Sequence, residues 1–407
     1  MRAERLCKAT ATLKPDTDHA DAGSVWRSPS SPLSNSQGFL LPTLGPVRTE
    51  DFIYQIKREF LMRTKIAIAL MLLVALVGTL SAQDTTTLTL LTHDSFNVTE
   101  DVLKAFEEES GITVSILRVG DAGQMVNQAI LSKGAPLGDM LYGVDNTFLS
   151  RALNADLFIP YESPGLEDVD ESFVLDEEHN VTPIDYSDVC LNYDIGYFEE
   201  ENLDVPTSLA DLAKPEYKGL LVALNPATSS PGLAFLMATI EEFGTEGEYT
   251  YLDYWTDLVA NDVLITDGWT EAYFGEFTMG SETGTRPIVV SYATSIPFTY
   301  IEEDDAATTA SIIADNTCFR QIEFAGILKG SEHEEEAQMF IDFMLSREFQ
   351  EDMPMQMYVF PVNNKAEQPE IFVKYALTPE KPVVMDYTLI EENREEWIQD
   401  WTETVLR

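Results

Sequence analysis

The chain has 407 residues, of which 70 are acidic and 25 are basic, and its formal net charge is −45 at pH 7. This charge argues against nucleic acid or an anionic membrane surface as the main partner, and it suits either a cationic ligand or simply a well-solvated surface. Hydrophobic residues make up 44% of the chain, as in a core-forming protein that is long enough for two domains.

The first predicted element is a secretory signal peptide at residues 62–82. Arg63 and Lys65 form a short basic start, the apolar run 66–77 follows, and small residues lead to Ala82. This order of regions is typical of a signal peptide. The apolar run is short for a membrane span, which takes about 20 residues.

Met62 is therefore the predicted start of the protein. Residues 1–61, which include a stretch rich in serine, proline and glycine, are predicted to be a non-native or disordered extension. A genuine N-terminal extension is the alternative. Residues 83–407 are then an exported chain, soluble in the periplasm or another extracytoplasmic space.

Three cysteines, Cys7, Cys190 and Cys318, are too few for a disulfide scaffold or a zinc cluster. An exported compartment permits disulfides, and Cys190 and Cys318 lie in strand-like stretches. We predict that these two are paired, with two buried free thiols as the alternative.

The first part of the exported chain alternates strand-like and helix-like patterns. Val102, Leu103 and Phe106 recur at helical spacing, and Gly111 after them is a typical helix end. The predicted elements are a strand and polar turn at 88–96, a helix at 98–111, a strand at 112–119, a helix at 122–134, a strand at 139–145 and a helix at 146–158.

The same alternation returns later in the chain, and it indicates βαβ units on a mostly parallel sheet. No internal repeat of fixed period is visible, so the pattern favours two α/β lobes between which the chain crosses more than once. The later predicted elements are a strand at 219–226, a helix at 230–244, a helix-rich stretch at 246–280, a strand at 287–294, one long helix at 333–353 and a last helix at 392–407.

Ligands of open α/β sheets bind beyond the carboxyl ends of the strands, so the residues that follow each predicted strand are candidate site residues. They offer hydroxyls, carboxylates and aromatic rings, and no lysine or arginine, which suits a small, planar, positively charged molecule. The set comprises His93, Asp94 and Ser95; Asp121, Ala122 and Gly123; Asp145 and Asn146; residues 227–232; Ser295 and Phe298; and Trp269 and Tyr273 around another turn.

Each candidate also has an ordinary structural interpretation. The run 229–231 is a helix start with a hydroxyl and an early proline. Asp145 could instead cap a helix, and Asp94 could instead cap a turn. Trp269 and Phe298 have the alternative of core packing.

The segment 206–232, PTSLADLAKPEYKGLLVALNPATSSPG, resembles the middle of type II periplasmic binding proteins. The motifs THDSF, GVDN, TSSPGL, DGWTEAY and SYATS, in that order, are similar to those of the thiamine-binding proteins of ABC importers. The resemblance extends from about residue 88 to residue 405, and five motifs in order are more specific than any one of them.

The resemblance implies an α/β, two-lobed type II periplasmic binding protein fold. Its mixed, mostly parallel sheets carry helices on both faces, and a hinge joins the lobes. We expect the first lobe to comprise residues 83–185, the second lobe residues 186–292, and residues 293–407 to return to the first lobe and supply the C-terminal helices.

The resemblance also implies a set of ligand-contacting residues, one of which stacks on the aminopyrimidine ring of thiamine. Asp94 or Asp121 would offset the charge of the thiazolium ring, and Asp145 joins the set as the carboxylate that ends the third strand. The implied contacts are Asp121, Ala122, Ser229, Ser230, Trp269, Tyr292, Ala293, Thr294 and Ser295, with Phe298 as the stacking ring and Tyr358 as a further aromatic residue.

Three positions depart from the family pattern. His93 replaces a tyrosine, Phe298 replaces the stacking tyrosine, and Ala227 replaces an arginine. The last change predicts a preference for free thiamine over its phosphate esters, because an anionic phosphate would find no cation there.

The expected partners are thiamine and the permease and ATPase subunits of an ABC importer, with no cofactor, no nucleic acid and a monomeric state. An iron(III)-binding protein is one alternative, but it would need clustered phenolates and the sequence has no Tyr-Tyr pair. A polyamine-binding protein is another. A thiamine-processing enzyme would need an activated nucleophile, and Cys190 and Cys318 have no histidine beside them.

Overall fold

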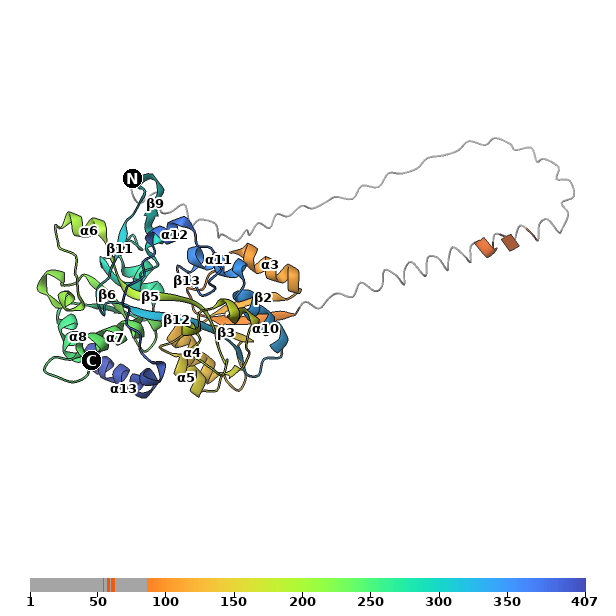
Figure 1. Cartoon of the computed structure of the whole chain (residues 1–407), viewed down its shortest axis with the longest axis horizontal. Coiled ribbons are helices and arrows are strands. Elements are labelled where there is room, and N and C mark those ends of the chain that lie inside the picture. Colours follow the sequence, from red (N-terminus) through yellow and green to blue (C-terminus); the bar gives the residue numbers. More distant parts are fainter. Residues whose placement is uncertain (1–53, 55–56, 59, 63–85) are drawn as a thin grey trace, which may run out of the picture. The chain divides into compact units, whose positions relative to one another are not determined.

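The computed structural model describes residues 86–407, together with residues 54, 57–58 and 60–62 (Figure 1). The expected extension at 1–61 and signal peptide at 62–82 fall almost wholly outside the described residues, and both stay predictions. Within the described part of the chain, no helix has the length and apolar character that a membrane crossing requires.

A mixed sheet of 11 strands forms the frame of the protein. Three of its strands lie off the main path, where β4 (Phe158–Ile159) pairs with β12, and β11 (Thr309–Ile312) and β13 (Phe360–Pro361) pair with β5. A separate hairpin consists of β9 (Tyr300–Ile301) and β10 (Ala306–Ala307). The main path runs in the order β2 (Thr113–Arg118), β1 (Thr87–Thr92), β3 (Met140–Asp145), β12 (Phe319–Leu328), β5 (Thr182–Asp194), β8 (Ile288–Tyr292), β6 (Leu221–Leu224) and β7 (Leu264–Thr266).

The two ends of this sheet are parallel and its middle is antiparallel. Strands β2, β1 and β3 are parallel, as are β8, β6 and β7, in agreement with the predicted βαβ units. Strand β12 runs antiparallel to both β3 and β5, and β5 runs antiparallel to β8. The sheet is therefore less parallel than the local alternation indicates, because the long strands β5 and β12 in its middle run antiparallel to their neighbours (Figure 1). The lobe boundaries expected after residues 185 and 292 stay predictions.

The helices beside β1, β2 and β3 cover both faces of that part of the sheet. On one face, α3 and the pair α10 and α11 enclose a core that includes Phe106, Phe340 and Phe349. On the other face, α4 and α5 pack against β3. Helix α3 ends as the sequence indicates, at Gly111 with φ 73°. These helices are α3 (Glu100–Ser110), α4 (Ala122–Leu131), α5 (Leu149–Asn154), α10 (Glu334–Met344) and α11 (Arg347–Gln356).

Among the helices beside β6, β7 and β8, α7 packs against β5, β6 and β8. The last helix, α13, contacts both α5 and α8, and Trp401 meets Trp255 edge to face with 5.4 Å between ring centroids. The helices are α6 (Ile195–Glu200), α7 (Ser230–Phe243), α8 (Tyr251–Ala260), α9 (Trp269–Glu271) with a π-helical turn at Ala272–Glu276, α12 (Glu370–Tyr375) and α13 (Tyr387–Val405). Short 3-10 turns lie at Pro164–Asp168, Glu171–Phe173, Leu209–Ala213, Pro215–Tyr217, Ile296–Thr299 and Glu302–Asp304.

The single long helix predicted at 333–353 is wrong, because the chain forms α10 and α11 there. Ser346 takes an extended conformation between them, and its side chain accepts a hydrogen bond from the backbone N–H of Phe349. A serine in this role satisfies one of the orphan donors at the start of a helix. The apolar periodicity continues through the break, which is why the sequence pattern does not reveal it.

The predicted disulfide between Cys190 and Cys318 is present, with 4.4 Å between their Cα atoms. Cys190 lies in β5 and Cys318 immediately precedes β12. Both sulfurs are buried against Ala293. The crosslink therefore ties β5 to the start of β12, two neighbouring strands in the middle of the sheet.

Candidate functional site

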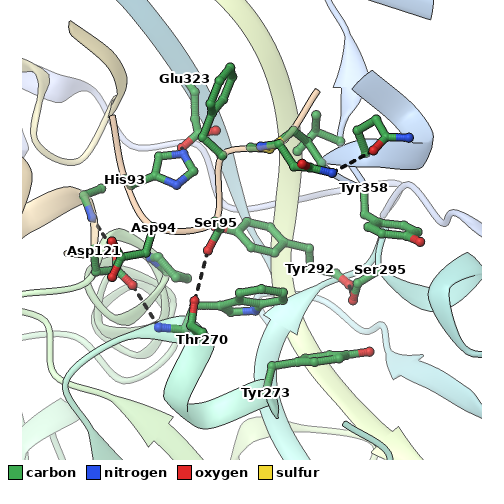
Figure 2. Close-up of a pocket in the computed structure, with 18 of the residues that line it drawn as sticks. His93, Asp94, Ser95, Asp121, Thr270, Tyr273, Tyr292, Ser295, Glu323 and Tyr358 are labelled. Atoms are coloured by element: carbon green, nitrogen blue, oxygen red, sulfur yellow. Dashed lines mark hydrogen bonds and ion pairs between the residues drawn. The ribbon is translucent and has the colours of Figure 1, made fainter. Parts of the chain in front are cut away.

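A cavity of about 570 Å³ opens at the carboxyl ends of the parallel strands. Its walls come from the loop after β1, the starts of α4 and α7, the segment around α9, the loop after β8, and the turn between α11 and β13. Two carboxylates and two aromatic rings lie on different sides of this cavity. In Figure 2, Asp94 and Asp121 lie on one side of the pocket and the rings of Tyr273 and Tyr358 on the other.

The loop after β1 is held by hydrogen bonds from three directions. The N–H of Asp94 donates to the carbonyl of Gly120 at 2.8 Å. The guanidinium of Arg118 donates to the carbonyl of Phe96 through Nη2 at 2.8 Å and through Nε at 3.3 Å. The amide of Asn97 donates to Oε1 of Gln356 at 2.7 Å. These contacts fix the loop that presents His93, Asp94 and Ser95 to the cavity.

Asp121 precedes α4 and bridges two walls of the cavity. One carboxylate oxygen accepts the N–H of Ala122 at 2.7 Å, and the other accepts the N–H of Trp269 at 2.8 Å. Burial raises the pKa of Asp121, while the hydrogen bonds from Trp269, Ala122 and Ser230 and the charge of His93 oppose that shift. The hydroxyls of Ser95 and Thr270 make a second contact across the cavity at 3.3 Å.

Five aromatic side chains form a continuous wall. Trp269 stacks on Tyr273 with 5.0 Å between centroids and meets Phe274 edge to face at 5.5 Å. Phe298 contacts Phe274 at 5.7 Å and Tyr358 at 5.5 Å. Phe274 and Phe298 are 43% and 41% exposed, which is unusual for rings this large and leaves their surfaces free to take a ligand.

Polar groups behind this wall hold the rings in place. Nε1 of Trp269 donates to Oγ of Ser291 at 3.0 Å. The hydroxyl of Ser295 accepts the amide of Asn192 at 2.7 Å. The bond to Ser291 thus fixes the orientation of the Trp269 ring.

Two ionisable groups line the cavity on the side of β12. Nε2 of His93 lies 3.5 Å from Oε1 of Glu323, and both residues are buried. Burial alone would lower the pKa of His93, but the charges of Glu323, Asp121 and Asp94 outweigh it, and the net shift is upward. His93 has room for its ring because residue 143 is glycine, since a Cβ there would meet Cδ2 of His93 at 2.2 Å.

Nine of the thirteen residues predicted for the site line this cavity, and their role in binding stays a prediction. Four do not line it. Asp145 is fully buried and accepts hydrogen bonds from the hydroxyl of Thr147. Ser229 is buried beneath the start of α7, Ala293 packs on the disulfide, and Thr294 meets the hydroxyl of Ser187 at 2.5 Å. The nine are Asp94, Asp121, Ala122, Ser230, Trp269, Tyr292, Ser295, Phe298 and Tyr358.

The expectation that the site offers no arginine is wrong, because Arg118 lines the cavity. Arg118 is the last residue of β2 and its side chain reaches the pocket from there, whereas the candidate residues follow the ends of the predicted strands. Glu323 was also missed. It lies inside an apolar strand, and a carboxylate in such a strand is itself a signal. Four further candidates that follow predicted strands or turns also line the cavity, namely His93, Ser95, Pro231 and Tyr273. The lining residues that the sequence did not indicate also include Phe96, Asn97, Thr270, Phe274, Met355, Gln356, Met357 and Val359.

Among the described residues, no group of three or more histidine, cysteine, aspartate or glutamate side chains is arranged to hold a metal ion. What the cavity offers instead is an aromatic wall, carboxylates and hydroxyls, a combination that binds flat and cationic molecules.

Comparisons with known proteins agree with the fold. A family model described as bacterial extracellular solute-binding protein matches residues 135–376. The thiamine-binding periplasmic proteins of Salmonella typhimurium (strain LT2) and Escherichia coli (strain K12) are each 28% identical to this chain over 332 residues, which is 79% of this chain and 94% of each relative. A solved structure of a periplasmic thiamin binding protein superposes with a TM-score of 0.70 at 25% identity, covering 80% of this chain and 98% of that one.

Proposed function

Since the chain belongs to the bacterial extracellular solute-binding protein family, we propose that it captures thiamine in this cavity and delivers it to an ABC importer. Proteins of this family bind solutes outside the cytoplasm and are not enzymes. The chain is accordingly an exported binding protein, and the thiamine-processing enzyme considered above is set aside.

The observation that carries the proposal is the aromatic wall facing a group of carboxylates. Thiamine combines a flat aminopyrimidine with a thiazolium whose positive charge is permanent. The exposed faces of Phe274 and Phe298 suit the flat ring, and the carboxylates of Asp94, Asp121 and Glu323 suit the cation. A cation over an aromatic face contributes about 0.5–2 kcal/mol.

The remaining lining groups have roles that follow from their chemistry. The hydroxyls of Ser230 and Ser295 suit the ring nitrogens and the hydroxyethyl oxygen of thiamine. The contacts of Asp121 with Trp269 and of Ser95 with Thr270 join opposite sides of the cavity. Ligand binding would favour this joined state, which a permease could distinguish from an open one.

Titration calorimetry tests the proposal, with thiamine, spermidine and ferric citrate as separate ligands. We expect one-to-one binding of thiamine with a submicromolar Kd, equivalent to a binding free energy beyond about −8 kcal/mol. Binding of spermidine or ferric iron with no binding of thiamine would leave the family assignment standing and show that thiamine is not the ligand. We also propose that the protein acts as a monomer, which light scattering with and without thiamine would check.

Thiamine monophosphate is expected to bind at least tenfold more weakly than thiamine, a difference of about 1.4 kcal/mol. Asp94, Asp121 and Glu323 place carboxylates around the cavity, and two donors of Arg118 are engaged by the carbonyl of Phe96. An added phosphate would therefore meet mainly like charge. The same calorimetric titration with the monophosphate measures the ratio, and equal affinities would contradict this expectation.

A further inference from the structure

Three carboxylates lie side by side in neighbouring strands next to the cavity. In the register of the sheet, Glu323 of β12 is paired with Asp145 of β3 on one side and with Asp185 of β5 on the other. Directly paired residues point to the same face, so three acidic side chains occupy one small region. Like charges in this arrangement repel each other and must be compensated.

Each of the three is compensated differently. Asp185 accepts a hydrogen bond from the hydroxyl of Tyr142 at 2.5 Å, and burial and the charge of Glu323 raise its pKa well above the usual value. Asp145 accepts from Thr147, and burial raises its pKa to about 7. Glu323 accepts a hydrogen bond from the hydroxyl of Tyr142 at 3.4 Å, and Nε2 of His93, whose pKa its charge raises, lies 3.5 Å from its other oxygen.

Of these three carboxylates, Glu323 alone lines the cavity, and His93 lines it as well (Figure 2). The side chains of both are only 9% exposed, so water screens their interaction weakly. A ligand cation that enters the cavity meets a buried carboxylate already paired with a histidine. Two positive charges beside one buried carboxylate repel each other, and only the imidazole can lose its charge.

We propose that Glu323 pairs with the positive charge of the ligand and that His93 releases its proton when the ligand binds. This inference rests on the proposed function, because thiamine supplies a charge that cannot titrate. Glu323 then acts beside Asp94 and Asp121 in selecting a cation, and His93 pairs with the carboxylate of Glu323 while the cavity is empty.

The surroundings of His93 support the direction of this exchange. Without ligand, the neighbouring carboxylates hold the pKa of His93 above its usual value despite burial. A ligand cation would lower the pKa of His93 again. Binding is therefore accompanied by proton release between the two pKa values, and affinity rises with pH through that window and levels off above it. The groups around the imidazole are Glu323, Asp121 and Asp94, Tyr142 with its partner Asp185, and Arg118 and Tyr292 on the cavity wall.

The test is calorimetry of thiamine binding near pH 7 in buffers with different ionisation enthalpies, which yields the number of protons released. We expect a substantial fraction of one proton to be released, and an affinity about tenfold higher near pH 8 than near pH 5.5, as one unit of pKa shift implies. Thiamine binding without proton release would overturn this inference and leave the proposed function standing. Failure to bind thiamine at all would overturn both.

Two variants identify the source of the proton. His93→Gln should bind thiamine with no proton release and with an affinity that does not change across this pH range. Asp145→Asn is the matched control, because Asp145 is buried outside the cavity and also titrates near neutrality. If Asp145→Asn abolishes the release and His93→Gln retains it, the assignment to His93 is wrong.

Glu323→Gln tests the cation site itself. We expect at least a tenfold loss of thiamine affinity, with unfolding followed by circular dichroism to confirm that the variant is folded. A folded Glu323→Gln variant with unchanged affinity would show that the ligand charge lies elsewhere. Because the buffer experiment uses the unaltered protein, it decides the question even where a variant does not fold.

Discussion

Replacing Asp121 with alanine is expected to weaken thiamine binding by about 100-fold, or about 2.7 kcal/mol. The carboxylate of Asp121 accepts the backbone N–H groups of Ala122 and Trp269 from opposite sides of the cavity. Its removal takes away a negative charge close to the ligand and a contact that joins the two sides. Hydrogen bonds to charged groups contribute about 1.5–3 kcal/mol, so the loss of this residue should dominate the other wall positions.

Calorimetry of the Asp121→Ala variant measures this effect, with Asp101→Ala as the charge-matched control. Asp101 is an exposed carboxylate in the first turn of α3 and does not line the cavity. The isosteric Asp121→Asn variant keeps one acceptor oxygen and should lose less affinity than Asp121→Ala. If the Asp121→Ala variant binds thiamine as tightly as the control, Asp121 is not part of the binding site.

Removal of the disulfide by the double substitution Cys190→Ala and Cys318→Ala is expected to cause the largest loss of stability. The bond closes a loop between residues separated by 128 positions. In the chain-entropy account, a loop of this length corresponds to about 5 kcal/mol, an upper figure because measured effects are often smaller. The melting temperature should fall by about 10 °C.

Thermal unfolding followed by circular dichroism measures the change in the double variant. Reducing agent supplies the control, because it should lower the melting temperature of the unaltered protein and leave that of the variant unchanged. Thiamine affinity at a temperature where the variant is folded should be nearly unaffected, since neither cysteine lines the cavity. An unchanged melting temperature would mean that the crosslink contributes little.

Local patterns in the sequence predict the parallel ends of the sheet and their helices. Helix α3 is a clear case, because its apolar spacing and the final Gly111 are both local features. The antiparallel middle cannot be predicted in this way. The pairing of β12 with β3 and β5 joins residues far apart in the chain, and no local periodicity records which distant strand a segment meets.

The site shows the same division. Residues directly after strands, such as Asp94 and Asp121, reach the cavity because the strands end there. Over residues 292–295 the chain turns, so that Tyr292 and Ser295 face the cavity while Ala293 meets the disulfide. Glu323 enters from the middle of a strand, through a register that only the assembled sheet defines.

The order of strands in the sheet has a consequence for how the chain can mature as it leaves the cytoplasm. Strand β3 ends at Asp145, but its neighbour β12 begins at Phe319. The chain crosses the membrane with its N-terminus first. The edge of β3 that pairs with β12 therefore stays unpaired until the last quarter of the protein has crossed the membrane. An unpaired strand edge is a template for pairing with other chains. Chains truncated before β12 should therefore aggregate, because this edge of β3 stays unpaired in them.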